Sequence, residues 1–179
     1  MNARLLAAVV SAVLALSGCG GKDGPGKVGL YDRAPVPAVP DRTQAIGPAG
    51  SALLSDGTYW AELIGVNDSS APSLTFELTQ ALFAQTCIDE LGADECTNDY
   101  GVIAEPHQST SGSQADLVSV TVVGENQQNL AITAAELASL IAGNAPGTPA
   151  PEGYAYVEFP FLLTVQGGKI VEAHQIWVP

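Results

Sequence analysis

Basic side chains are scarce in this chain of 179 residues, which holds 6 Lys and Arg against 19 Asp and Glu. Residues 51–179 are the extreme case, because they contain one basic residue, Lys169, and sixteen acidic ones, a formal charge of −15. Such a surface repels phosphate backbones and anionic headgroups. The composition therefore argues against nucleic acid as a partner. It is typical of a soluble exported domain, and it also suits a cationic partner or a divalent metal ion.

Histidine and recognisable catalytic motifs are also scarce. The chain has 2 His, so a His-rich metal site is excluded and any Ser-His-Asp triad has to use His107 or His174. The sequence has no GxSxG, GxxxxGK[ST] or HExxH motif and no EF-hand loop. We therefore find no signature of a known catalytic mechanism.

Long apolar runs are absent as well, and the longest covers residues 5–16 with Ser11 as its one polar residue. At about 1.5 Å of rise per residue this run is too short to cross a hydrocarbon core about 30 Å thick. Its place directly after Arg4 is typical of the apolar region of a signal peptide. We expect a signal peptide over residues 1–18 and no membrane-spanning segment after it.

The stretch Leu16-Ser17-Gly18-Cys19 resembles the lipobox of bacterial lipoproteins. In these proteins the cysteine sulfur carries a diacylglycerol and a peptidase cleaves just before the cysteine. The resemblance implies that Cys19 is the lipidated N-terminus of the mature protein, anchored at the extracytoplasmic face of the cell membrane. The alternative is an ordinary cleaved signal peptide that ends near a cysteine.

The rest of the chain divides into two parts. Residues 19–50 are rich in glycine and proline and lack apolar periodicity, which predicts a flexible tether after Cys19. Residues 51–179 have the length of one domain with its own hydrophobic core. We therefore expect a single acidic domain behind a tether.

Two further cysteines, Cys87 and Cys96, lie within the expected domain. Export places them in an oxidising compartment, where an even number of cysteines favours a disulfide. A metal or redox pair is the alternative, but the C-x₈-C spacing is not that of such motifs and no histidine lies nearby. We predict a Cys87–Cys96 disulfide.

Hydrophobic periodicity predicts six strands and two helices. One helix follows the second strand and ends at Gly92, and the other runs from Thr133 to Gly143, with Thr133 and Glu136 as a capping box. A polar loop is expected over residues 107–116. The expected strands are residues 57–66, 73–79, 100–106, 117–124, 155–166 and the run that starts at Lys169.

The last two strands flank Gly167-Gly168, a pair suited to a type I′ turn. With that turn, residues pair so that their numbers sum to 335. Glu172 then lies opposite Leu163, and His174 lies opposite Phe161. This register predicts both polar side chains on one mostly apolar face.

The element order β-β-α-β-β-α-β-β predicts an α+β fold, a curled antiparallel sheet with two helices on one side. Pro160 has no amide hydrogen and predicts an edge or a bulge. Thr164-Val165, Gly168, Ile170-Val171 and the ending Trp177 to Pro179 are similar to the closing hairpin of small exported proteins of high-GC Gram-positive bacteria. This resemblance implies the fold and no activity.

Glu172 and His174 are the candidate catalytic pair. A carboxylate and an imidazole on an apolar face can polarise a bound molecule or act as acid and base. The alternative is that both residues line the solvated side of the sheet or that His174 is simply hydrogen-bonded.

Two larger groups of residues are candidate binding sites. Acidic residues around the cysteine loop offer hard oxygen ligands for Ca²⁺, although charge runs are commonly solvated surface; they are Asp89, Glu90, Asp94, Glu95 and Asp99. Six aromatic residues can line a groove or belong to the core and its rim; they are Tyr59, Trp60, Tyr100, Tyr154, Tyr156 and Trp177.

Together these features predict a lipoprotein of the cell envelope that binds a ligand or a protein partner without catalysis or a cofactor. Two alternatives stay open. One is a small envelope hydrolase or isomerase that uses Glu172 and His174. The other is an inhibitor or immunity-type protein whose acidic face meets a basic target.

Overall fold

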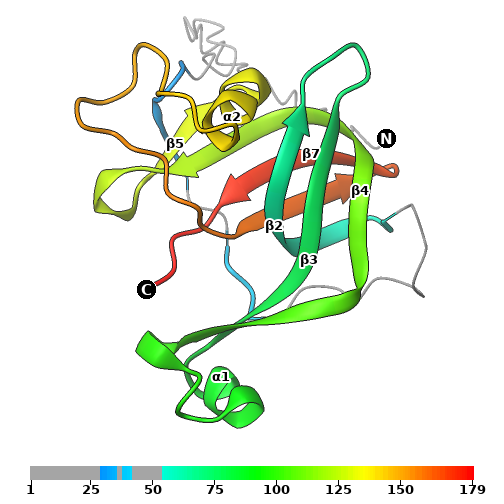
Figure 1. The fold of residues 1–179 in the computed structure, drawn as a ribbon, viewed down its shortest axis with the longest axis vertical. Helices are drawn as coiled ribbons and strands as arrows, with labels where there is room; N and C mark the ends of the chain where they lie inside the picture. The colour runs from blue at the N-terminus through cyan, green and yellow to red at the C-terminus, as the bar shows by residue number, and fades with distance from the viewer. Residues whose placement is uncertain (1–28, 36–37, 42–53) are drawn as a thin grey trace, which may run out of the picture.

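The computed structural model of the chain describes residues 29–35, 38–41 and 54–179, with the backbone alone for residues 104–114. In this part of the chain seven strands form one sheet in the order β1-β5-β4-β3-β2-β6-β7, with two α-helices outside it (Figure 1). The α+β class is confirmed. The sheet is mixed, however, and not antiparallel throughout as expected, because β4 and β7 run parallel.

The first hairpin joins β2 (Gly57–Asn67) and β3 (Ser73–Phe83). Its turn is held by the Asn67 side chain, whose Oδ1 accepts a hydrogen bond of 3.1 Å from the amide of Ser69. The expected inward residues of β3 are confirmed as core, with exposed fractions of 4% or less for Leu74, Phe76 and Leu78. The alternation of apolar and polar residues therefore predicts the inward face of this hairpin correctly.

Strand β4 (Tyr100–Val123) is continuous, so the loop expected at residues 107–116 is wrong. Its first half pairs with β3 as far as Gln114, and its second half pairs with β5 (Asn129–Ile132) and with β7 (Lys169–Gln175). A polar segment of this composition can form a strand when a neighbouring strand supplies hydrogen-bond partners for its backbone groups. A short 3₁₀ turn, Glu125–Gln127, links β4 to β5.

Both expected helices are present. Helix α1 (Ala84–Leu91) ends at Gly92 as predicted, with a φ of 87°, but it begins later than expected because β3 runs on to Phe83. Helix α2 (Ala134–Ile141) begins after Thr133, whose hydroxyl accepts the amide of Glu136 at 3.1 Å. The predicted N-cap is thus confirmed.

The main strands form a curled sheet. β2, β3 and β4 are successive antiparallel strands, and β6 (Phe161–Gln166) returns after a long connection to lie beside β2, which is the Greek-key order. β7 then pairs with both β6 and β4. The result is a partly open Greek-key barrel, an architecture shared with OB folds. This likeness concerns strand order and says nothing about ligands.

The main core fills the inside of the curled sheet under α2. It combines inward side chains of β2, β3, β6 and β7 with Leu137 and Leu140 of α2, which are 0% and 2% exposed. A second cluster lies around Trp60 and Leu162 on the outer face of β2 and β6. The two sides of these strands are therefore both covered in part.

Part of the expected tether packs against the domain, contrary to the sequence prediction. β1 (Arg33–Ala34) pairs with β5, and Tyr31 is a core residue with 7% exposure. Pro40 accepts a hydrogen bond of 3.0 Å from the indole of Trp60 through its carbonyl. Tyr31 was not predicted as a core residue because its glycine- and proline-rich surroundings resemble a linker.

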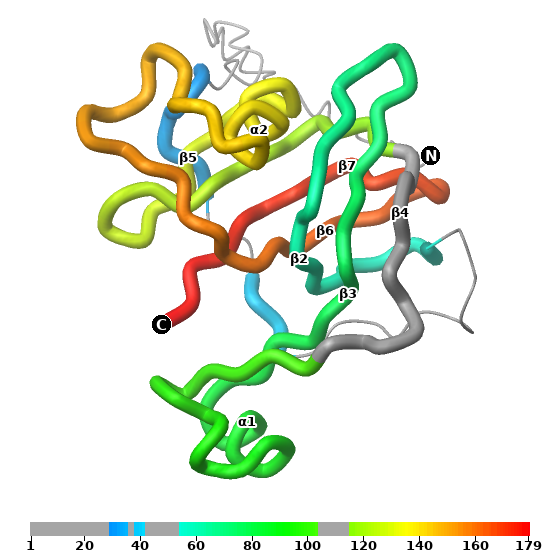
Figure 2. Tube along the Cα trace, in the orientation of Figure 1, coloured from blue at the N-terminus to red at the C-terminus, as the bar shows by residue number. Residues whose placement is uncertain are grey.

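Strands β3 and β4 run together away from the rest of the sheet and end in an arm that contains α1 and the 3₁₀ turn Thr97–Asp99 (Figure 2). The predicted disulfide between Cys87 and Cys96 is confirmed and lies at the centre of a small separate core. Gly101 allows β4 to approach it, since a Cβ there would lie 2.8 Å from the Cys87 sulfur.

Candidate functional site

The C-terminal hairpin has the expected turn but a different register. Gly167 and Gly168 both have positive φ, 59° and 74°, as a type I′ turn requires. Val165 pairs with Ile170 as predicted, but Thr164 pairs with Glu172, so that Val171 is an extra residue. This β-bulge shifts the register of the rest of the strand by one residue.

The shift moves the candidate catalytic pair to the other face of β6, which corrects the sequence prediction. Glu172 lies opposite Thr164, and His174 lies opposite Leu162, not beside Leu163 and Phe161. A change of one residue exchanges the two faces of a strand because side chains alternate. Ala173, at 0% exposure, occupies the core position instead.

His174 is held by hydrogen bonding rather than directed into a cavity. Its Nδ1 lies 3.0 Å from the hydroxyl of Thr121, which in turn accepts a hydrogen bond of 2.7 Å from the Asn129 amide. Its Nε2 lies 3.8 Å from Oε2 of Glu172, beyond hydrogen-bond distance. Burial lowers the pKa of His174 below 6.5, and the Glu172 carboxylate only partly offsets this. The ring is therefore neutral at pH 7.

The hydrogen-bond network around His174 continues into the interior. Asn129 also donates to the backbone oxygen of Gln175 at 2.8 Å. The Gln175 side chain, which is fully buried, accepts from the amide of Val123 at 2.9 Å and donates to the carbonyl of Val157 at 2.8 Å. These bonds join β4, β5, β7 and the segment before β6. The network therefore has a structural role, because it connects these strands through buried, satisfied hydrogen bonds.

Other predicted site residues do not form a site in the described structure. The side chain of His107 and the whole of Cys19 lie outside the described residues. The acidic residues of the arm, from Asp89 to Asp99, are all exposed. Among the residues that the structure describes, no three His, Cys, Asp or Glu side chains come together as they would around a metal ion.

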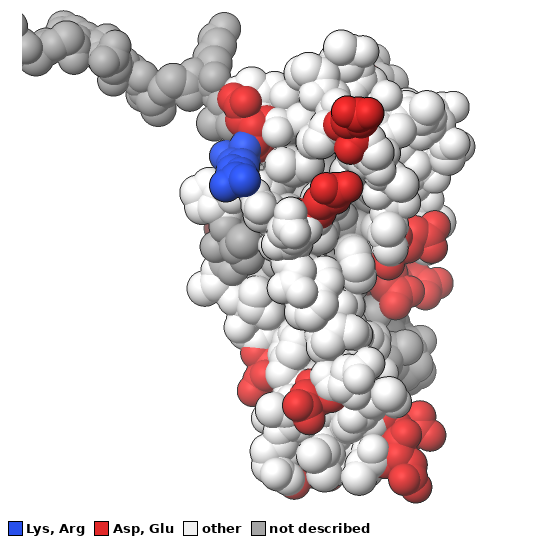
Figure 3. Space-filling model, turned by 90° about the vertical axis from the view of Figure 1, so that its left-hand side faces the viewer, with Lys and Arg blue, Asp and Glu red and all other residues white. Residues whose placement is uncertain are grey.

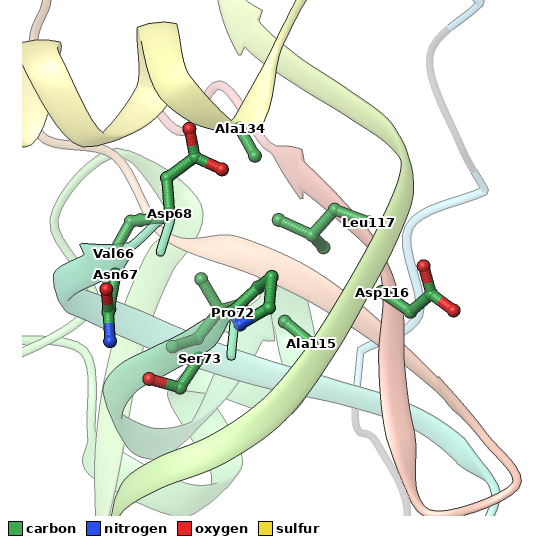
Figure 4. Close-up of a pocket in the computed structure, with 10 residues that line it drawn as sticks. Val66, Asn67, Asp68, Pro72, Ser73, Ala115, Asp116, Leu117 and Ala134 are labelled. Atoms are coloured by element: carbon green, nitrogen blue, oxygen red, sulfur yellow. The ribbon is translucent and has the colours of Figure 1, made fainter. Parts of the chain in front are cut away.

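A small hollow lies between the first hairpin and the start of α2 (Figure 4). Its volume is about 160 Å³. Pro72, Ala115 and Leu117 form its apolar floor, while the Asp116 side chain points away from it (Figure 4). Ligand pockets for small molecules usually have about 300–1,000 Å³. This hollow is therefore too small to be the main binding site.

A larger hollow, which we name the edge groove, has a volume of about 580 Å³. It lies between β2 and the segment that leads into β6, next to the end of α2. The β2–β6 ladder ends at the pair Ala61 and Phe161, and Pro160 before it has no amide to extend the ladder. The groove is lined by Glu62, Leu63, Ile64, Tyr100, Val102, Ile141, Tyr156, Glu158, Phe159, Pro160, Phe161 and Val178. Neither Glu172 nor His174 lines either hollow.

The edge groove combines aromatic and apolar side chains with two carboxylates. Burial, and next the charge of Glu62, raises the pKa of Tyr100 to about 12. Burial, and next the charge of Glu158, raises the pKa of Tyr156 to about 12. Both phenols are therefore neutral at physiological pH. The exposed apolar side chain of Ile64, 55% accessible, extends the surface.

The six aromatic residues predicted to line a groove or to belong to the core have three different surroundings. Tyr59, Trp60 and Tyr154 are buried, Tyr100 and Tyr156 line the edge groove, and Trp177 is 38% exposed and lines neither hollow. Tyr100 is supported from behind, because its ring packs 5.5 Å from that of Phe83, which packs 6.1 Å from Trp60. The groove itself was not predictable from spacing, because it depends on where two strands separate.

The surface around these features is acidic. Figure 3 shows Asp and Glu side chains along the whole length of one face, with basic side chains confined to its upper part. Among the described residues the basic ones are Arg33 and Lys169, and Lys169 lies 4.0 Å from Asp116. A cationic ligand therefore meets little repulsion on this domain.

Comparison with known proteins does not assign the chain to a family. No protein-family model matches it, and no match is found among curated proteins or among solved structures. Within the described residues, no helix has both the length and the apolar character to span a membrane.

Proposed function

We propose that this protein is a lipoprotein of the cell envelope that binds a ligand or partner in the edge groove and carries out no catalysis. The observation that carries the proposal is the groove itself, 580 Å³ in volume and lined by aromatic, aliphatic and acidic side chains. The signal peptide predicted over residues 1–18 and the lipobox-like position of Cys19 support the extracytoplasmic, membrane-anchored location.

The arrangement of His174 supports a binding role over the hydrolase or isomerase alternative. An acid-base pair needs access to the substrate. Thr121, which contacts the ring, is 2% exposed, and the His174 side chain is 12% exposed. Glu172 and His174 are not in hydrogen-bond contact. The hydrogen bond between His174 and Thr121 instead links β7 to β4.

The test places a photo-crosslinking amino acid at Val102, which lines the groove and is 36% exposed, in the full-length protein in its own cells. Val118, 77% exposed and outside the groove, is the matched control. We expect a crosslinked adduct from position 102 and none from position 118. Absence of an adduct at position 102 contradicts the binding role.

The anchor is tested separately by the mass of the protein extracted from its membrane in mild detergent. We expect a chain that begins at Cys19 and carries acyl groups. The Cys19→Ser variant is expected to lose both the acyl mass and the membrane fraction. An unacylated wild-type chain contradicts the proposed anchor without affecting the proposed groove.

A further inference from the structure

The structure also indicates what kind of molecule the edge groove accepts, an inference that rests on the proposed binding function. We propose that the groove binds an extended peptide segment of a partner protein that carries lysine or arginine. The segment pairs as an added strand with the free edge of β2 and places its cationic side chains beside Glu62 and Glu158.

The free edge of β2 is the first support. β2 pairs with β6 only from Gly57 to Ala61, whereas its pairing with β3 continues to Asn67. No described strand pairs with residues 62–67 on the side where β6 leaves off. An antiparallel strand directs alternate N–H and C=O groups to each side. Helix α2 packs against β2, and its first residue Ala134 lies beside Val66 and Asn67, so only residues 62–64 of this side open into the groove and are available for strand addition.

The separation of the two strands follows from Pro160 and from a backbone hydrogen bond that its carbonyl accepts. Pro160 cannot donate to β2, and its carbonyl accepts a hydrogen bond of 2.8 Å from the amide of Ile176. This bond directs the chain before β6 toward the C-terminal segment. The groove is consequently preformed, which lowers the cost of ordering it on binding.

Charge is the second support. The groove lining includes Glu62 and Glu158 but neither lysine nor arginine. Glu62 is also the cross-strand partner of Glu77 on β3, and like charges in that relationship are destabilising. A bound cation relieves this repulsion. The rings of Tyr100 and Tyr156 offer further favourable contact to a lysine or arginine side chain.

The exposed backbone of the site favours a peptide over a small cation. Three residues of the β2 edge, 62–64, line the groove and correspond to about 10 Å at about 3.3 Å per residue, the length of a short extended segment. A small amine can neutralise the carboxylates but leaves the backbone groups of the edge without partners. An extended peptide satisfies both, with side chains alternating toward the groove and away from it.

The experiment measures binding of short synthetic peptides to the full-length protein in detergent micelles by calorimetry. The first peptide alternates valine and lysine, the second replaces lysine by glutamate, and the third keeps lysine but has N-methylated amides along one edge. We expect measurable binding of the first, with affinity at least about tenfold lower for the other two, because charge and backbone pairing are each required.

Matched variants locate the site. The double variant Glu62→Gln/Glu158→Gln is expected to weaken binding of the valine–lysine peptide about three- to twentyfold, since exposed ion pairs contribute modestly. The charge-matched control Glu125→Gln/Glu152→Gln changes residues outside the groove lining and is expected to change affinity less than about twofold. Circular dichroism melts establish that both variants are folded.

The possible outcomes separate the two proposals. Equal binding of the N-methylated and the unmodified valine–lysine peptides overturns strand addition. Equal weakening of peptide binding by both double variants overturns the location of the site in the edge groove. Equal affinity for a simple diamine overturns the peptide in favour of a small cation. Failure of every peptide together with a crosslinked adduct at Val102 overturns this inference and leaves the binding function intact, whereas failure of both removes the binding function.

Discussion

The hydroxyl of Tyr31 donates a hydrogen bond of 2.5 Å to Oε1 of Glu136 across 105 residues of sequence. The same carboxylate oxygen accepts the amide of Gly147 at 2.7 Å. Glu136 therefore joins the N-terminal segment, α2 and the loop after α2. This use of Glu136 replaces the reciprocal bond to the N-cap amide that the sequence predicts.

Replacing Tyr31 by phenylalanine tests this junction. Loss of a hydrogen bond to a charged acceptor is expected to lower the free energy of unfolding by about 1–3 kcal/mol. The expected fall in melting temperature is about 2–4 °C for each kcal/mol. Thermal melts of the full-length protein measure it.

The matched control is Tyr154→Phe, at a ring that packs edge-on against Tyr31 with centroids 5.4 Å apart. The buried hydroxyl of Tyr154 has no hydrogen-bond partner among the described residues. Removing it is expected to leave stability unchanged or to raise it. Equal losses in the two variants contradict the role assigned to the Tyr31–Glu136 bond.

Gly101 is expected to tolerate no side chain. A Cβ at this position would lie 2.6 Å from Leu91 Cδ1 and 2.8 Å from the Cys87 sulfur, which the disulfide holds in place. We expect Gly101→Ala to destabilise the protein by about 1–3 kcal/mol in denaturant titrations. At Gly65 the nearest atom to a Cβ is 3.9 Å away, so Gly65→Ala is expected to stay within about 0.5 kcal/mol.

Removal of the Cys87–Cys96 disulfide is expected to destabilise the arm and spare the curled sheet. The bridge closes a short loop, for which chain entropy gives about 2–3 kcal/mol. α1 packs mainly against β3, β4 and the Thr97–Asp99 turn. In Cys87→Ala/Cys96→Ala, hydrogen exchange is expected to accelerate in the arm but not in β6 and β7. Acceleration throughout the sheet contradicts an independent arm.

Local rules predicted the elements whose structure depends on neighbouring residues. The Thr133 cap, the end of α1 at Gly92 and the Gly167-Gly168 turn each follow from the conformational preferences of a few residues. Alternation likewise predicted the inward face of β3. These parts of the fold could be read directly from the chain.

Features that depend on distant residues could not be predicted in this way. The bulge at Val171 arises where β7 pairs with both β6 and β4, and it changed the surroundings assigned to Glu172 and His174. Val118 shares the alternation of Val120 and Val122, which are 4% and 0% exposed, but is itself 77% exposed, next to a register shift between β4 and β7. Tyr31 was missed because its partners are Glu136 and Tyr154.

Acid is expected to destabilise the protein partly through His174. Its pKa in the folded state is lowered by burial from the ordinary value of 6.5. As the pH falls through 6.5, the unfolded chain binds a proton that the folded protein does not, so the free energy of unfolding decreases. Above about pH 7.5 both states are neutral at this group and the contribution vanishes.

The measurement compares wild type with His174→Gln between pH 7.5 and 5.5, since the carboxylates and His107 are common to both. The wild type is expected to lose more unfolding free energy than the variant. NMR titration of the His174 ring is expected to give a midpoint below 6.5. A midpoint at or above 6.5 contradicts the effect of burial.

Neutralising either member of the Glu62–Glu77 cross-strand pair is expected to stabilise the fold. Removal of a like-charge pair on adjacent strands gives a gain of about 0.2–1 kcal/mol. Glu62→Gln and Glu77→Gln are therefore each expected to raise the melting temperature, and the two increases are expected to be similar to one another. The valine–lysine peptide is expected to lose more affinity with Glu62→Gln, because Glu77 does not line the groove. Destabilisation by both changes contradicts repulsion within the pair.

The docking of Tyr31 and β1 sets how far the domain can stand from a lipid on Cys19. If the whole stretch to residue 51 were free, it could reach about 110 Å; from Cys19 to Gly29 the chain extends at most about 35 Å. The described chain begins beside α2 and β5, at the end of the molecule opposite α1 (Figure 1). With the proposed anchor, the domain is therefore held close to the membrane surface, and its disulfide-bonded arm is the part able to extend farthest outward.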